Sequence, residues 1–128
     1  MTSPKRVLLI DDDRQIVEAI GIRIKAAGYD VVTACDGLAG VATARSLRPD
    51  MIVLDLHLPK MDGIEVLSKL HQEEETKGIP VIVVSASAVD QNQALERGAR
   101  YFLEKPYDAK KLIEAVDSAI AEAAAIGS

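Results

Sequence analysis

Short apolar runs alternate with segments of helical periodicity along the whole chain, and this alternation predicts an α/β fold. The apolar runs are short and rich in β-branched residues, which favours strands at about residues 6–11, 29–34, 51–55, 80–84 and 100–103. The segments that follow them carry apolar residues three and four positions apart, which is typical of amphipathic helices. We expect these helices at about residues 16–27, 37–47, 64–70 and 88–97, and from 108 onward.

Each connection between the predicted strands is long enough for a helical crossover, so we expect the strands to be parallel. Right-handed crossovers with helices on both faces favour a doubly wound, flavodoxin-like sheet of five strands in the order 2-1-3-4-5. In that order the first and third strands are neighbours where the strand order reverses. Sheets of this type bind their ligands there, at the carboxyl ends of the strands.

Two of the predicted strands end on carboxylates. Asp11, Asp12 and Asp13 close the first apolar run, and Asp55 closes the third. Neighbouring strands would bring at least three negative charges together, which is costly unless a cation lies among them. Capping of a helix explains one acid only, and Asp13 is the candidate for that cap. The carboxylate oxygens of the other acids are ligands that suit a hard divalent cation such as Mg²⁺.

Two further polar residues follow later strands. Lys105, which precedes Pro106, offers a positive charge for an anion at the end of the fifth strand. Ser85 ends the fourth strand and is followed by the small Ala86, whereas Ser87 is the residue we expect to cap the next helix. Acids, metal, lysine and hydroxyl together suit the binding of a phosphoryl group.

Four motifs in this order resemble the receiver domain of two-component response regulators, the CheY-like superfamily. The similarity extends from about residue 6 to residue 120. The motifs are Leu9-Ile10-Asp11-Asp12-Asp13, Asp55-Leu56-His57-Leu58-Pro59-Lys60-Met61-Asp62-Gly63, Val84-Ser85-Ala86 and Phe102-Leu103-Glu104-Lys105-Pro106.

The resemblance implies a role for each residue of the site. Asp55 would accept a phosphoryl group from a histidine of a sensor kinase or of a histidine phosphotransfer protein. Asp12, Asp55 and the backbone carbonyl of His57 would bind Mg²⁺ or Mn²⁺, and Asp11 would hold a metal-bound water. Lys105 would pair with Asp55 and then with the phosphoryl oxygens.

The resemblance also implies a conformational switch. Ser85 would turn toward a phosphoryl oxygen and Phe102 would move inward, which changes the surface of the fourth helix, fifth strand and fifth helix for partner binding. Thr and Tyr are frequent at these two positions in the family, and plain core packing is the alternative for Phe102. The fourth helix has little to bury, so we expect it to be weakly held. On the first helix, Ile22 lies opposite the apolar stripe and is a candidate for docking the phosphodonor.

Composition and charge limit which molecules the protein could bind and where it could lie in the cell. The net charge of −5 and the absence of a basic stripe argue against direct binding of nucleic acid. One cysteine excludes an internal disulfide, and no stretch has the length of a membrane span or the core of a signal peptide. We expect one cytoplasmic receiver domain over residues 1–128, with its core at about 6–124 and no output domain. Its downstream target is an unidentified protein, and phosphorylation-dependent dimerisation stays open.

Three other classes of protein fit the sequence less well. A haloacid-dehalogenase-like phosphatase would use Asp11 and Asp13 in its first motif, but the chain is short for that fold and no acidic pair follows Lys105. A receiver-like module that is not phosphorylated would usually lack a site residue, and none is missing. A dinucleotide enzyme is disfavoured because no Gly-rich turn follows the first strand. We therefore expect no enzymatic activity other than phosphoryl transfer to the domain itself and the later removal of that phosphoryl group.

Overall fold

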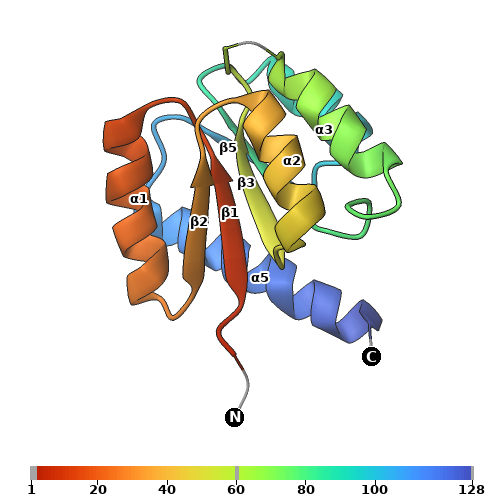
Figure 1. Cartoon of the computed structure of the whole chain (residues 1–128). Helices are drawn as coiled ribbons and strands as arrows, with labels where there is room; N and C mark the ends of the chain where they lie inside the picture. The colour runs from red at the N-terminus through yellow and green to blue at the C-terminus, as the bar shows by residue number, and fades with distance from the viewer. Residues whose placement is uncertain (1–2, 60, 128) are drawn as a thin grey trace.

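Strands and helices alternate along the described part of the chain, residues 3–59 and 61–127 of this computed structural model (Figure 1). The strands are β1 (Arg6–Ile10), β2 (Asp30–Ala34), β3 (Met51–Asp55), β4 (Val81–Ser85) and β5 (Tyr101–Glu104). The helices are α1 (Arg14–Ala26), α2 (Gly37–Leu47), α3 (Gly63–Gln72), α4 (Asp90–Glu96) and α5 (Ala109–Gly127). Every predicted element is present, with ends that differ by at most two residues. Lys60, in the predicted loop after β3, lies outside the described residues.

The five strands form one parallel sheet in the order β2-β1-β3-β4-β5, as predicted. β1 lies between β2 and β3, and Ile10 is paired with Leu54 across β1 and β3. The residues that follow this pair are Asp11 and Asp55. Parallel pairing in this register therefore delivers both acids to one edge of the sheet at the same level.

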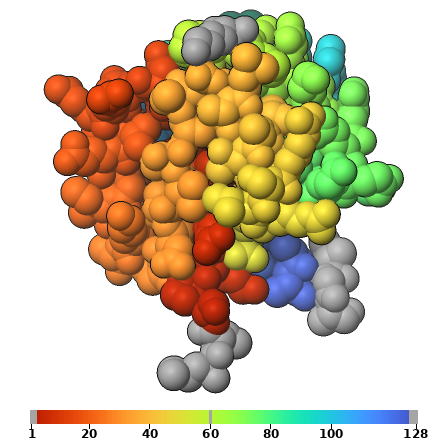
Figure 2. Space-filling model, in the orientation of Figure 1, coloured from red at the N-terminus to blue at the C-terminus, as the bar shows by residue number. Residues whose placement is uncertain are grey.

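The core consists of two layers, one on each face of the sheet, because successive side chains of a strand point to opposite faces. Helices α2, α3 and α4 cover one face, and α1 and α5 cover the other (Figure 1). The first layer includes Leu8, Ile10, Ile52, Leu54, Val83, Val41, Leu67 and Ala94. The second includes Val7, Leu9, Met51, Val53, Val84, Ile24, Leu112 and Val116. In the space-filling view of the first face, α2 covers the space in front of the strands (Figure 2).

The start of α1 is fixed by Asp13, the predicted cap. Its side chain accepts hydrogen bonds from the backbone N–H groups of Gln15, at 3.0 Å, and Ile16, at 3.3 Å. This satisfies two donors that have no partner within the first turn of a helix. Asp13 is thereby separated in function from the two acids before it.

The start of α4 differs from the prediction. The cap position is Val89, and among the described residues no side chain caps this helix, so the predicted cap at Ser87 is wrong. The Ser87 N–H instead donates to Oγ of Ser85 at 3.1 Å. Of the seven residues of α4 only Ala94 is buried, in agreement with a helix that has little to bury.

The loop after β3 turns back sharply on itself before α3. The Gly63 N–H donates to the carbonyl oxygen of Leu56 at 3.0 Å, and the Asp62 side chain accepts from the N–H of Ile64 at 3.2 Å. A Cβ atom at Gly63 would lie 2.2 Å from the Leu56 oxygen, so only glycine fits there. This closure fixes the backbone that follows Asp55. No helix in the described ranges combines the length and the apolar character that crossing a bilayer requires.

Candidate functional site

Three carboxylates meet at the carboxyl edge of the sheet. Asp11, Asp12 and Asp55 each place one oxygen within 4.8 Å of the others. Asp11 and Asp55 are buried, whereas Asp12 is exposed. The cluster that the strand order predicts is therefore formed, and it opens to solvent on the side of Asp12.

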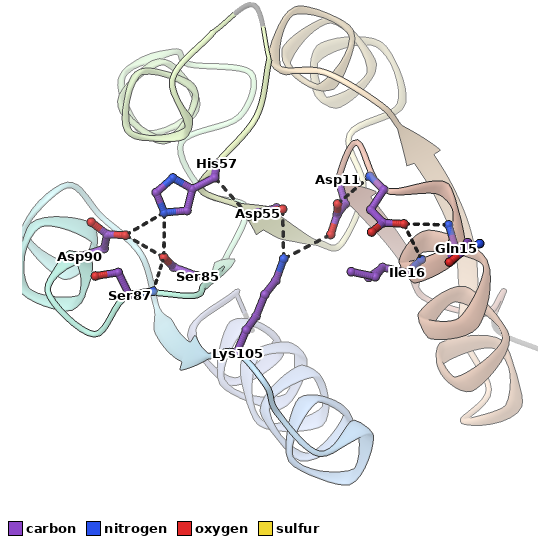
Figure 3. Close-up of polar contacts among 10 residues, drawn as sticks. Asp11, Gln15, Ile16, Asp55, His57, Ser85, Ser87, Asp90 and Lys105 are labelled. Atoms are coloured by element: carbon purple, nitrogen blue, oxygen red, sulfur yellow. Dashed lines mark hydrogen bonds and ion pairs between the residues drawn. The ribbon is translucent and has the colours of Figure 1, made fainter.

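Lys105 is the positive charge of this cluster. Its Nζ lies 3.1 Å from Oδ2 of Asp55 and 3.9 Å from Oδ2 of Asp11 (Figure 3). The Lys105 N–H donates to the backbone carbonyl of Ser85 at 2.7 Å, which extends the β4–β5 pairing and places the lysine at the sheet edge. The peptide bond to Pro106 is cis. One ammonium group thus faces two buried carboxylates.

The two buried acids are held by the same local arrangement. Oδ1 of Asp11 accepts from the N–H of Asp13 at 3.0 Å, and Oδ1 of Asp55 accepts from the N–H of His57 at 3.1 Å. In each case the other oxygen is the one that lies toward Lys105. Because one oxygen is fixed by the backbone, each carboxylate presents its second oxygen in a defined direction.

The electrostatics of the site show an excess of negative charge. Burial raises the pKa of Asp11, and repulsion from Asp55 and Asp12 raises it further, while the Asp13 amide and Lys105 oppose this. Burial also raises the pKa of Tyr107 to about 12, with a contribution from the charges of Asp11 and Asp55. Three carboxylates lie beside one ammonium group, so Lys105 alone does not balance their charge. A divalent cation among the carboxylates would do so.

The Ser85 hydroxyl is buried and takes part in a second polar cluster next to the first (Figure 3). Ser85 Oγ donates to Oδ2 of Asp90 at 2.7 Å, and His57 Nε2 lies 3.2 Å from both of these atoms. The His57 side chain is 63% exposed, yet its ring makes these two contacts. Sequence reasoning missed Asp90, although an acid five positions after Ser85, in the first turn of a helix, was a signal for it.

The remaining candidates lie outside these two clusters. Phe102 is half-buried and packs against the core layer on the face of α2, α3 and α4. Ile22 is 62% exposed on α1, as expected. A groove of about 440 Å³ separates α1 from the segment after β5, and it was not predicted. It is lined by Ile16, Ala19, Ile20, Ala86, Lys105, Pro106 and Tyr107.

The strand order and this group of acids, lysine and serine define a CheY-like α/β domain. A family model for the response regulator receiver domain matches residues 7–117. The chain belongs to the response regulator receiver family of two-component systems. Receiver domains of this family are signalling modules. Neither the fold nor the family supports the alternative of a haloacid-dehalogenase-like phosphatase.

Relatives of two kinds match the chain. Over 113 residues it is 42% identical to the DNA-binding dual master transcriptional regulator RpaA of Synechocystis, covering 87% of this chain and 47% of RpaA. Over 122 residues it is 32% identical to the polar-differentiation response regulator DivK of Brucella anthropi, covering 94% of this chain and 99% of DivK. The chain thus spans about half the length of RpaA and nearly the whole length of DivK.

Solved structures agree with this assignment. The receiver domain of a LuxO repressor protein from Vibrio parahaemolyticus superposes with a TM-score of 0.90 at 28% identity, over 97% of this chain and 95% of that one. The receiver domain of the sensor histidine kinase PA1611 from Pseudomonas aeruginosa gives a TM-score of 0.86 at 27% identity, over 92% of this chain and 98% of that one. The latter structure has a magnesium ion coordinated in its active-site cleft.

Proposed function

We propose that this receiver domain accepts a phosphoryl group on Asp55 from a histidine of a sensor kinase or of a histidine phosphotransfer protein. The position of Asp55 carries the proposal. It is a buried carboxylate with one oxygen held by the His57 amide and the other paired with Lys105. An acid fixed in this way beside a cation can meet an anionic donor in line.

The donor set fits a hard divalent cation, Mg²⁺ or Mn²⁺. We propose that the side chains of Asp12 and Asp55 and the backbone carbonyl of His57 would bind it, and that Asp11 would hold one of its water ligands. The three carboxylates lie close enough to share an ion, and burial together with their mutual repulsion raises the pKa of Asp11. When bound, the cation would offset charge on the acceptor and on the phosphoryl oxygens.

The chain's own residues would then carry the transfer. An oxygen of Asp55 forms a bond to phosphorus while the bond between phosphorus and the donor histidine nitrogen breaks, and that nitrogen keeps the electron pair. Lys105, whose ammonium lies 3.1 Å from Oδ2 of Asp55, would stabilise this carboxylate before transfer and the phosphoryl oxygens afterwards. The amide of His57 keeps the carboxylate oriented throughout.

Phosphorylation would be transmitted by Ser85 and Phe102. The Ser85 hydroxyl would turn toward a phosphoryl oxygen, and the half-buried ring of Phe102 would move into the space beside it. Both residues adjoin α4 or β5, so we propose that the surface of α4, β5 and α5 changes and binds a downstream protein. The phosphodonor would dock on α1, where Ile22 is an exposed candidate contact.

Mass spectrometry tests the acceptor assignment. The protein is incubated with Mg²⁺ and acetyl phosphate, and we expect the mass of one phosphoryl group to be added in a form that is stable to acid and lost in base. Asp55→Asn should abolish this addition. Asp30→Asn, at an exposed position at the opposite end of the sheet, should leave it unchanged. An unmodified wild-type protein, or modification that persists in Asp55→Asn, would refute the assignment.

A further inference from the structure

The Ser85 hydroxyl has a single hydrogen to donate, and in this structure it is donated to Asp90. The Ser85 Oγ to Asp90 Oδ2 distance is 2.7 Å, which is typical of a strong bond to an ionised acceptor. The hydroxyl oxygen also accepts from the Ser87 N–H at 3.1 Å. A serine hydroxyl donates once. It therefore cannot donate to Asp90 and to a phosphoryl oxygen on Asp55 at the same time.

We propose that Asp90 is a positioning residue that holds Ser85 in the unphosphorylated arrangement and competes with the phosphoryl group for its hydrogen. This inference rests on the proposed transfer to Asp55. The Asp90 side chain is 23% exposed and the Ser85 side chain is fully buried, so water competes only weakly for this bond. Removal of the Asp90 carboxylate frees the hydroxyl, and less free energy is then needed to turn it toward Asp55.

The hydrogen bond between Ser85 and Asp90 is called the latch below. His57 extends this latch to a contact among three segments. Its Nε2 lies 3.2 Å from Asp90 Oδ2 and 3.2 Å from Ser85 Oγ, so it joins the loop after β3 to the end of β4 and the first turn of α4. The group is not a hydrolytic triad. A triad requires the acid and the serine to bond to different ring nitrogens of the histidine, whereas here both face Nε2.

The latch also explains how a hydroxyl can affect a helix. Asp90 is the first residue of α4, which begins without a side-chain cap within the described chain and buries only Ala94. The bond to Ser85 joins the first turn of this weakly packed helix to the end of β4. When Ser85 turns away, the first turn of α4 loses that bond. The same exchange of one hydrogen thus reports phosphorylation to the α4 surface.

The initial rate of phosphorylation by limiting acetyl phosphate tests the latch. We expect Asp90→Ala to raise this rate about fivefold, the factor that corresponds to the loss of one net hydrogen bond. Asp90→Asn keeps an acceptor of the same shape without the charge and should give a smaller increase. Glu96→Ala, which removes an exposed acid from the other end of α4, is the matched control and should leave the rate unchanged.

The decisive comparison uses the Ser85→Ala background. A latch acts only through the Ser85 hydroxyl, so Asp90→Ala should have no effect on the rate there, whereas general loosening of α4 would persist. Thermal unfolding identifies any variant that is not folded, and in that case Asp90→Asn carries the test. An equal or lower rate in both Asp90 variants, or an increase that persists without Ser85, overturns the latch. Failure of the wild-type protein to be modified at Asp55 overturns the proposed function instead.

Discussion

The Lys105 ammonium lies 3.1 Å from Oδ2 of Asp55, although fifty residues separate the two in sequence. Asp55 ends β3 and Lys105 follows β5, with β4 between these strands in the sheet. The pair exists because parallel strands deliver their carboxyl ends to one edge, and because the lysine side chain is long enough to extend past β4. The ion pair is therefore a product of the strand order.

Loss of the ammonium should slow phosphorylation strongly. We expect Lys105→Met to lower the initial rate with acetyl phosphate by about a hundredfold, the usual effect of removing one group that stabilises developing charge. Lys110→Met, at an exposed position near the start of α5, is the control and should change the rate little. A Lys105→Met protein that is folded and phosphorylated at the wild-type rate would contradict the role given to this lysine.

The raised pKa of Asp11 predicts how the metal-free protein responds to pH. A raised pKa means that the fold favours the neutral acid. The contribution of this group to stability is therefore fully present below the ordinary value of 3.8 and is lost as the pH rises through the folded-state pKa. At neutral pH, Asp11→Asn should therefore raise the free energy of unfolding and the melting temperature of the metal-free protein.

Thermal unfolding between pH 4 and pH 8, with and without Mg²⁺, measures this effect. Without metal, the wild-type protein should lose stability as the pH rises relative to Asp11→Asn, and Mg²⁺ should restore it in the wild-type protein more than in the variant. Asp30→Asn, at an exposed position far from the site, should behave as the wild type. A less stable Asp11→Asn protein would show that the carboxylate is stabilising without metal.

The tyrosines predict a second pH dependence, at alkaline pH. Burial and the hydrogen bond to Asp117 raise the pKa of Tyr29 to about 12, and burial raises that of Tyr107 to about 12. The Tyr101 pKa is also raised, first by its hydrogen bond to Glu122. The stability from these groups is fully present below pH 10, the ordinary value, and is lost as the pH rises toward 12. Tyrosinate absorbance should therefore appear at higher pH in the folded protein than in guanidinium, and coincident titrations would disprove this.

Alanine substitutions at Gly63 and Gly78 form a matched test of how much space each glycine has. A Cβ atom at Gly63 would meet the carbonyl oxygen of Leu56 at 2.2 Å, whereas one at Gly78 would meet nothing within 4 Å. We expect Gly63→Ala to lower the free energy of unfolding by about 2 kcal/mol or more, because backbone must move. Gly78→Ala should be neutral or stabilise by about 0.5 kcal/mol. Denaturant unfolding measures both, and equal effects would show that the Gly63 loop relaxes freely.

The sheet and the acidic cluster could be predicted because they depend on features that are local in sequence. An apolar run that ends on Asp11 or Asp55 indicates that the strand is buried and that its acid lies at the end of the strand. Helices between the runs require parallel strands, and parallel strands share one functional edge. The Asp13 cap could be predicted for the same reason, because capping involves residues two and three positions apart in sequence.

The polar cluster around Ser85 could not be predicted in the same way. A Ser-x-x-Asp pattern begins at Ser87, but the helix starts later and its acid, Asp90, bonds to Ser85 instead. Two acceptable hydrogen-bond arrangements compete here, and tertiary packing of the buried hydroxyl decides between them. The His57 ring joins the same cluster from a different strand end, a contact that depends on the separation of β3 and β4 rather than on sequence spacing.

Ser85 is attached to its surroundings from two sides. Its backbone carbonyl accepts the N–H of Lys105 at 2.7 Å, and its hydroxyl bonds to Asp90 at the start of α4. Under the proposed function, this one residue faces both the phosphorylated acid and the start of α4. Substitution of Ser85 should therefore alter signal lifetime and signal strength together.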